Sequence, residues 1–204
     1  FSVYLHRDKH WFCVNLLEKK MNIVVFDAIP DPLDHNSQVY LDRLVENLKG
    51  VGHEVKVFTL RDMDINYCTG CWTCWWKTPG RCVFKDDMEQ VYPAMMAADR
   101  LVMFSPLSMG FVSSLLKKVN DRSVALLHPY IEIVQGECHH RKRYENYPDL
   151  ALIVNEEPDT DAYDLEIIGD IYERFALNFR ADLKAYTSVA QTTPQEAAYA
   201  VSCV

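Results

Sequence analysis

The sequence predicts a doubly wound α/β domain built on a five-stranded parallel sheet. Two observations support this prediction: five short apolar or β-branched runs recur along the chain, and amphipathic helical segments separate them. Strands that alternate with helices form a parallel sheet with helices on both faces. The sequence has no internal repeat and no low-complexity linker. We therefore expect one domain.

Each predicted strand is a run of apolar or alternating residues bounded by polar or glycine-containing segments. The most continuous apolar runs are typical of strands covered on both faces. The five predicted strands are Asn22–Asp27, His53–Leu60, Arg100–Ser105, Leu150–Asn155 and Leu183–Val189.

The helices between these strands show apolar residues at intervals of three and four. Pro30 and Pro32 exclude helix from the loop after the first strand, and Asn36 or Ser37 can cap the helix that follows. Further helices are predicted to open at Asp86-Asp87, after Gly110 with Val112 on its apolar face, around Leu165, and at Pro194.

Two segments are predicted to lack regular structure. Pro106–Gly110 reads as a tight loop after the third strand, and residues 128–148 read as irregular because Pro129 and Pro148 interrupt them. Within the second segment, His139–Arg143 is a short basic patch that suits a nicotinamide phosphate or an acidic partner, or is a solvated loop.

Composition restricts the functional classes. The 204 residues carry a formal net charge of -8, which argues against a nucleic-acid binder. No apolar run approaches the roughly 18 residues of a membrane span, so we expect no membrane partner. Residues 1–20 do not read as a secretion signal and are expected to be an extension of unclear role before a domain at 21–204. Seven cysteines without such a signal indicate a reducing, cytoplasmic setting.

Ligands of a doubly wound sheet bind beyond the carboxyl ends of its strands. Four loops are expected at that edge: Asp27–Asn36, Cys68–Asp87, Ser105–Gly110 and Asn155–Asp161. Neither a G-x-G-x-x-G run nor a G-x4-G-K-[ST] run is present, which disfavours a dinucleotide fold and a P-loop.

Four cysteines in the second of these loops have the spacing C-x2-C-x2-C-x7-C. Thiols at two-residue intervals can hold a [4Fe–4S] cluster, and four thiolates can also hold a structural Zn2+. The third reading is a set of reduced thiols in an apolar loop containing Trp72, Trp75 and Trp76. The four candidate metal ligands are Cys68, Cys71, Cys74 and Cys82.

Three stretches together carry a resemblance to a known family. They are Asn22–Leu60, the run C-T-G-C-W-T-C-W-W-K-T-P-G-R-C-V-F-K-D-D-M, and the run S-P-L-S-M-G-F-V-S-S-L-L-K-K-V-N-D-R. The chain resembles the flavodoxin-fold NADPH-dependent FMN reductase superfamily, in the branch that includes the iron–sulfur flavoproteins. The resemblance covers roughly residues 21–189. It implies strand order 2-1-3-4-5, FMN at the ends of the first and third strands, and a homodimer or homotetramer.

The resemblance also assigns residues to the FMN site. Asn36 and Ser37 match the end of the family's phosphate loop. The glycines and the arginine of that loop are absent here, and a stretch containing Asp27, Asp31 and Asp34 takes their place. The residues that match the loop laid against the isoalloxazine ring are Ser105, Pro106, Leu107, Ser108, Met109 and Gly110.

The expected function is an FMN-dependent NAD(P)H oxidoreductase that passes electrons to a small acceptor or a partner protein. Because the cofactor performs the chemistry, no catalytic acid or base is assigned to the chain. The alternatives are an electron-transfer module, with cluster and flavin side by side, and a flavodoxin-like scaffold that has lost FMN binding.

Overall fold

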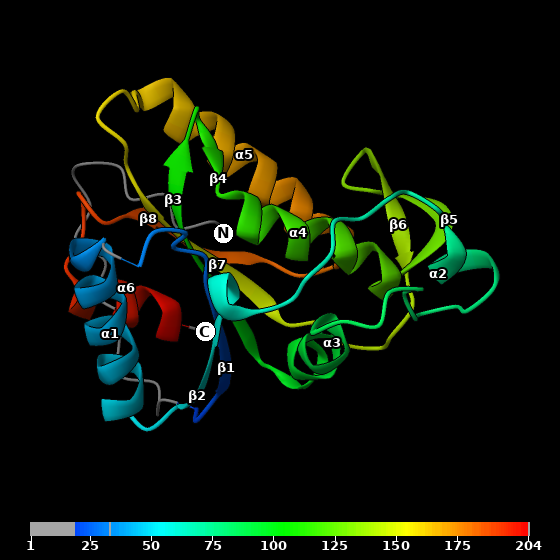
Figure 1. The fold of residues 1–204 in the computed structure, drawn as a ribbon, viewed down its shortest axis with the longest axis horizontal. Helices are drawn as coiled ribbons and strands as arrows, with labels where there is room; N and C mark the ends of the chain where they lie inside the picture. The colour runs from blue at the N-terminus through cyan, green and yellow to red at the C-terminus, as the bar shows by residue number, and fades with distance from the viewer. Residues whose placement is uncertain (1–18, 33, 204) are drawn as a thin grey trace.

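A computed structural model describes residues 19–32 and 34–203 of the chain. Its central sheet has five parallel strands in the order β2-β1-β3-β7-β8, with a short sixth strand, β4, antiparallel to β3 (Figure 1). If only the five parallel strands are numbered, in the order of the chain, this order is 2-1-3-4-5. The predicted fold class and strand order are therefore confirmed.

The predicted strands and helices recur with small shifts at their ends. The strands are β1 (Asn22–Asp27), β2 (Glu54–Thr59), β3 (Arg100–Ser108), β4 (Phe111–Val112), β5 (Leu127–Val134), β6 (Glu137–Lys142), β7 (Asp149–Asn155) and β8 (Leu183–Ser188). The helices are α1 (His35–Gly50), α2 (Thr73–Trp76), α3 (Met88–Ala97), α4 (Ser114–Arg122), α5 (Ala162–Asn178) and α6 (Pro194–Ser202), with 3-10 turns η1 (Leu60–Asp62) and η2 (Ser123–Leu126). Residues 1–18 of the predicted extension lie outside the described residues.

Alternate residues of each buried strand enter two separate apolar layers, because successive side chains of a strand point to opposite faces. Val24 and Phe26 join one layer, and Ile23 and Val25 join the other. Helices α3, α4 and α5 cover the first layer, and α1 and α6 cover the second (Figure 1). Burial on both faces explains why these strands read as continuous apolar runs.

Residues 128–148 contain a β-hairpin, so the prediction of an irregular segment was wrong. Strands β5 and β6 pair through the two-residue turn Gln135-Gly136, where both residues have positive φ, as a type I′ hairpin turn requires. Pro129 lies inside β5, where the register shifts between Leu127 and Ile131. A proline at such an irregularity does not interrupt the pairing on either side of it.

Two further predictions need correction near β3 and α1. Strand β3 continues through Ser108, so Pro106–Ser108 are strand rather than loop, and Val112 belongs to β4 rather than to a helix. Helix α1 is capped by Asp34, whose carboxylate accepts the N–H of Ser37. Asn36 and Ser37 therefore lie in the first helical turn.

Candidate functional site

The turn between β3 and β4 lies at the carboxyl edge of the sheet, where the sequence predicts a ligand. Its central residues are Met109 and Gly110, with φ of 53° and 71°. A left-handed conformation is costly for a residue with a Cβ, on the order of 1–2 kcal/mol. Met109 adopts it with its side chain 96% exposed, so burial of that side chain does not offset the cost. The two-residue hairpin between β3 and β4 requires this conformation, and its position at the strand edge leaves Met109 open to a ligand.

Gly110 is required by its surroundings as well as by its backbone. A Cβ atom at this position would stand 2.7 Å from Oδ1 of Asp164, in the first turn of α5. No ordinary contact is that short, so a larger residue would force the Asp164 carboxylate, which accepts the Asp161 N–H at the start of α5, to move. The turn is therefore held against the N-terminal end of α5.

Ser105 and Leu107 do not present their side chains to this edge. The Ser105 hydroxyl donates to the Pro106 carbonyl at 2.8 Å and accepts the Ser113 N–H at 2.9 Å. The Ser113 hydroxyl donates in turn to the Ala28 carbonyl at 2.7 Å, and Leu107 is fully buried. Of the six predicted ring-contact residues, Ser108 and Met109 are exposed, and Pro106 and Gly110 are half-buried.

The predicted phosphate end is organised around an arginine that sequence reasoning missed. Asp27 is buried, and its carboxylate accepts the Ile29 N–H at 3.1 Å and pairs with the Arg61 guanidinium at 2.9 Å. Burial raises the pKa of Asp27, although the Ile29 N–H and Arg61 act to lower it. Arg61 also donates to the Gln38 side chain in α1 at 3.3 Å. The Asp27 charge is thus turned toward Arg61.

The two residues that match the family's phosphate loop differ in their exposure to solvent. Ser37 is buried, and its hydroxyl accepts the side-chain N–H of Asn155 at 2.7 Å. Asn36 is exposed at the first turn of α1. A phosphate at this helix end would share it with the capping carboxylate of Asp34. The residues therefore fit a flavin ring better than they fit its phosphate.

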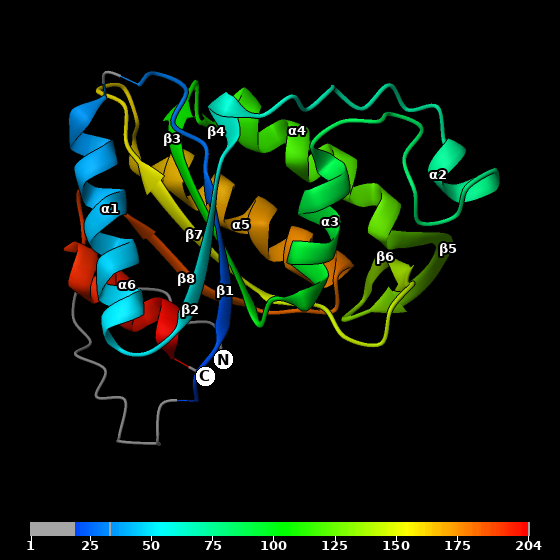
Figure 2. The same cartoon turned by 60° about the horizontal axis from the view of Figure 1, so that its bottom comes forward.

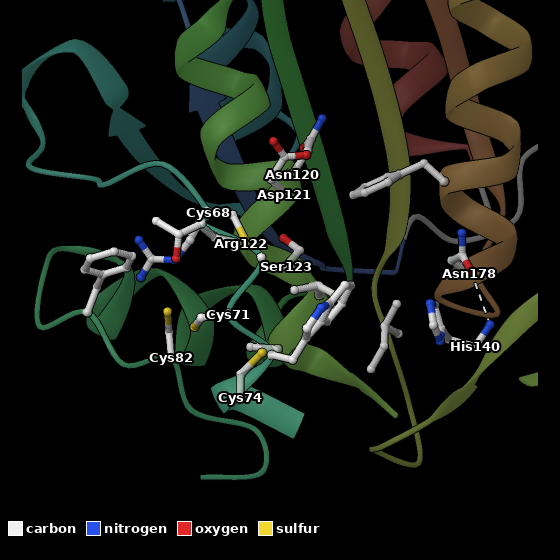
Figure 3. Close-up of a pocket in the computed structure, with 18 of the residues that line it drawn as sticks. Cys68, Cys71, Cys74, Cys82, Asn120, Asp121, Arg122, Ser123, His140 and Asn178 are labelled. Atoms are coloured by element: carbon white, nitrogen blue, oxygen red, sulfur yellow. Dashed lines mark hydrogen bonds between the residues drawn. The ribbon is translucent and has the colours of Figure 1, made fainter. Parts of the chain in front are cut away.

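All four cysteines of the C-x2-C-x2-C-x7-C run line one cavity of about 400 Å³ (Figure 3). Cys74 is buried, Cys82 is half-buried, and Cys68 and Cys71 are exposed. Burial raises the pKa of the Cys74 thiol, and the three other thiols raise it further through their negative charge as thiolates. Hydrogen bonds from Thr73 lower the pKa of Cys71.

The donor chemistry of this cavity suits a metal–thiolate group. Within residues 19–32 and 34–203, however, no three cysteine, histidine or acidic side chains are grouped closely enough to hold a metal ion. The four cysteine thiols would have to move closer together to bind a metal ion or cluster. That these cysteines hold a [4Fe–4S] cluster or a structural Zn2+ therefore stays a prediction.

A buried ion pair closes the loop that carries the cysteines. Arg122 and Asp86, with side chains 1% and 0% exposed, pair at 2.7 Å, and Arg122 also donates to the Asn66 carbonyl at 3.0 Å. Asn66 donates back to Asp86 through its main chain and side chain, both at 3.1 Å. Burial would raise the pKa of Asp86, but Arg122 and Asn66 lower it to about 2. We call these three residues the latch.

The cysteine cavity does not lie beside the β3–β4 turn. It is lined by Asn178 near the C-terminus of α5, whereas the turn contacts Asp164 near the N-terminus of the same helix. These positions are fourteen residues apart in one helix, which at 1.5 Å per residue is about 21 Å. Figure 2 shows β4 and the β5–β6 hairpin toward opposite ends of α5. The prediction that the cysteines share an edge with the flavin loop was therefore wrong.

Two tryptophans of the cysteine loop lie at or next to this cavity, Trp72 and Trp75. Trp72 lines it and stacks on Trp75, with ring centroids 4.5 Å apart. Trp75 donates its indole N–H to the Val124 carbonyl at 3.1 Å and packs on His140 at 5.1 Å. Burial lowers the pKa of His140. His140 belongs to the predicted basic patch, and its place in the hairpin is what brings it here.

Comparisons with known proteins agree with this architecture. Residues 21–152 match the family model described as NADPH-dependent FMN reductase. An iron–sulfur flavoprotein of Archaeoglobus fulgidus is 35% identical over 92 residues, which is 45% of this chain and 44% of the relative. One from Methanocaldococcus jannaschii is 32% identical over 112 residues, 55% of this chain and 56% of the relative. The chain thus spans about half the length of these curated relatives.

Solved structures with the same fold are more distant in sequence. RosB, solved with a bound 8-demethyl-8-formylriboflavin-5'-phosphate intermediate, is 13% identical with a TM-score of 0.65, over 90% of this chain and 77% of RosB. Azoreductase AzrA is 13% identical with a TM-score of 0.60, over 89% and 99%. The NAD(P)H:quinone oxidoreductase of Methanothermobacter marburgensis is 18% identical with a TM-score of 0.56, over 83% and 85%. At these identities the likeness shows the fold alone.

Among the described residues, no helix has the length and apolar character needed to cross a bilayer. The family match covers more than half of the chain and includes β1, the cysteine loop and the β3–β4 turn. The chain belongs to the NADPH-dependent FMN reductase family.

Proposed function

We propose that this chain is an FMN-dependent NAD(P)H oxidoreductase that passes electrons to a small acceptor or a partner protein. Membership of the FMN reductase family supports the class of reaction. The observation that supports it most in this molecule is the exposed Met109 in the β3–β4 turn, placed at the strand edge where ligands of this fold bind.

The chain's own part is to hold the cofactor. Ser108 and Met109, which are exposed, and the half-buried Gly110 would contact the flavin ring, and Asn36 at the start of α1 would approach the phosphate. FMN, when bound, supplies hydride acceptance from the nicotinamide and electron transfer onward. Because Asp27 is turned inward to Arg61, it adds no free anion to the cofactor site.

The test is FMN titration of the purified protein, followed by flavin absorbance, with NAD(P)H oxidation as the second readout. Gly110→Ala should weaken FMN binding, because the new methyl group meets Asp164. Gly136→Ala is the matched control, since Gly136 occupies the same position of a two-residue hairpin turn with nothing within 4 Å of its added Cβ. Protein that neither carries nor binds FMN would refute the proposal.

A second candidate is an iron–sulfur flavoprotein acting as an electron-transfer module. Four thiols on one cavity favour it, and the curated iron–sulfur flavoproteins are similar to this chain over about half their length. Iron and acid-labile sulfide, measured after anaerobic purification, should be present and should be lost in Cys74→Ser. Zinc in their place would indicate a structural metal, and intact thiols without either metal would remove this candidate.

The capping carboxylate of Asp34 favours a third candidate, a scaffold that no longer binds FMN. It predicts that Asn36→Ala and Gly110→Ala leave ligand binding unchanged. The homodimer or homotetramer and the cytoplasmic setting expected from the sequence stay predictions, which analytical ultracentrifugation and cell fractionation can test.

A further inference from the structure

A second cavity lies on the other side of the segment that carries Cys82. Its volume is about 420 Å³, close to that of the cysteine cavity. Cys82 and Phe84 line both cavities, so their segment is the wall between them. The other walls of the second cavity come from α3, from the end of η2 and from the loop after β6. Figure 2 shows the chain between α2 and α3 lying between α3 and the β5–β6 hairpin.

Much of the surface of this second cavity is apolar or aromatic. Phe84, Met96 and Leu126 line it with side chains that carry no polar group suited to a ligand. The Tyr92 hydroxyl is already engaged, because it donates to the Arg122 carbonyl at 3.0 Å. Tyr92 therefore offers a ligand its ring rather than its hydroxyl. Walls of this kind suit a planar apolar body.

The charge at this cavity is positive, although the chain has a formal net charge of -8. Lys85 and Glu89 line it and neutralise each other in an exposed ion pair at 2.9 Å. Arg81 also lines it, is exposed, and has no ion-pair partner among residues 19–32 and 34–203. A guanidinium without a partner can bind a carboxylate through two parallel N–H···O hydrogen bonds.

A second arginine adds to the positive charge behind this wall. The Arg143 side chain packs on Gly80, since a Cβ atom at Gly80 would stand 3.4 Å from Cδ of Arg143. Its guanidinium donates to the Leu127 carbonyl at 3.0 Å and meets no carboxylate within the described part of the chain. After burial, the Arg143 charge is the second cause that lowers the pKa of His128. Two guanidinium groups without counter-ions thus lie on the Gly80–Arg81 side of the cavity.

The cavity suits one negative charge better than the several charges of a nucleotide. The N-terminal end of the neighbouring helix α3 is occupied, because the Asp86 carboxylate accepts the Met88 N–H at 3.2 Å. Since Lys85 is paired as well, Arg81 is the cation left for a ligand among the lining residues.

We propose that this second cavity binds an aromatic monocarboxylate, with its ring between α3 and the Cys82 segment and its carboxylate on Arg81. The site goes beyond the proposed function, because it takes no part in electron transfer and does not depend on FMN. A bound ring would pack on the same wall that carries Cys82 and Phe84, so it should stabilise that part of the cysteine loop.

The probe is 2-naphthoate, and its control is 2-naphthamide, which has nearly the same shape without the charge. Calorimetry on the whole 204-residue chain, as purified, should give one saturable site for the acid. The acid should bind about tenfold more tightly than the amide, the gain expected for hydrogen bonds to a charged group. Added salt should weaken binding of the acid, because Arg81 is exposed. Equal affinity for the two probes, or no saturable binding of the acid, would overturn the proposal.

Arg81→Gln should remove the preference for the acid over the amide. Its control, Lys77→Gln, removes an exposed cation from the same loop, and Lys77 is not among the residues that line the cavity. The control should bind 2-naphthoate as tightly as the unchanged protein. If Arg81→Gln keeps the full affinity for 2-naphthoate, the carboxylate is not on Arg81 and the proposal is wrong.

A second pair of variants tests the α3 wall. Pro93 lines the cavity, is exposed and lies inside α3. Pro93→Glu and Pro93→Ala change the backbone in the same way, because both restore the missing N–H, but only glutamate adds a negative charge. Pro93→Glu should therefore bind 2-naphthoate several-fold more weakly than Pro93→Ala. Equal affinities in this pair would place the probe elsewhere on the protein.

Two further measurements separate this site from the proposed FMN site. Saturating 2-naphthoate should slow amide hydrogen exchange in residues 80–85, and protection confined to the β3–β4 turn would refute the second cavity as its site. Gly110→Ala should leave the affinity for 2-naphthoate unchanged, because Gly110 belongs to that turn. If the protein binds 2-naphthoate in the cavity but neither carries nor binds FMN, the proposed function fails while this site stands.

Discussion

The latch predicts a large and pH-dependent contribution to stability from Asp86. Its folded-state pKa is about 2, against an ordinary value of 3.8. Lowering the pKa by this much corresponds to a stabilisation of roughly 2 kcal/mol. Because the folded-state pKa is lowered, this stability is fully present above about pH 4 and is lost as the pH falls toward 2. Between pH 7 and pH 5 the contribution of Asp86 should stay constant.

Asp86→Asn removes the charge and leaves Arg122 buried without its counter-ion. Breaking a buried pair from one side costs about 3–5 kcal/mol, which for a chain of this size is a loss of about 6–20 °C in Tm. Urea unfolding followed by circular dichroism measures the change. Glu89→Gln is the control, because the Lys85–Glu89 pair is solvent-exposed and spaced i,i+4, and its loss should cost about 0.5 kcal/mol or less.

The double variant Asp86→Asn, Arg122→Met removes the stranded charge and should recover part of the lost stability. The reasoning is refuted if Asp86→Asn costs less than about 1 kcal/mol at pH 7, or if the double variant is no more stable than Asp86→Asn. Wild-type protein that loses this stability already between pH 7 and pH 5 would equally contradict the lowered pKa.

Three more substitutions have effects that follow from contacts of the described residues, each measured by urea unfolding. Arg61→Met strands the buried carboxylate of Asp27 and should cost about 2–4 kcal/mol at pH 7, below the full range for a buried pair because Arg61 is 21% exposed. Loss of the Arg61 charge should raise the pKa of Asp27 further, so the variant should recover stability as the pH falls toward 3.8. Equal losses of stability at pH 4 and pH 7 would argue against this. Tyr147→Phe removes a hydroxyl that donates to a main-chain carbonyl at 2.6 Å and accepts a main-chain N–H at 2.9 Å, for a loss of about 1–3 kcal/mol. Gly169→Ala would place a methyl group 2.8 Å from the Tyr186 ring. It should therefore destabilise the protein by about 1–2 kcal/mol, although alanine has the better helix propensity. A stabilised variant would contradict this contact.

The parallel sheet could be predicted because its strands are buried on both faces, which leaves a local apolar signal such as Ile23–Phe26. The β5–β6 hairpin was missed because Pro129 and the polar residues of β6 mask the alternation of Ile131 and Ile133. The dipeptide Gln135-Gly136 was the available signal, since glycine in a two-residue turn marks a hairpin.

Side-chain pairings across the fold left no such signal. Arg122 and Asp86 are separated by 36 residues, and Arg61 and Asp27 by 34. Which charges meet depends on how the loops cross the helices, and local patterns do not encode that. The separation of the cysteines from Gly110 was missed for the same reason, because the loop after β2 leaves the sheet edge and ends near the far end of α5.

The latch also determines how the buried thiol of Cys74 becomes accessible. Between Asn66 and Asp86, only Cys74 is buried, so this loop contributes little to the two apolar layers of the sheet. Such a segment can unfold locally, at a free energy set by its own tethers rather than by the global stability of the domain. Amide hydrogen exchange should therefore show residues 66–86 opening as one unit while β1 and β3 stay protected. Reaction of the Cys74 thiol with a reagent would then be governed by this opening, and acid below about pH 4 would accelerate it as Asp86 becomes protonated.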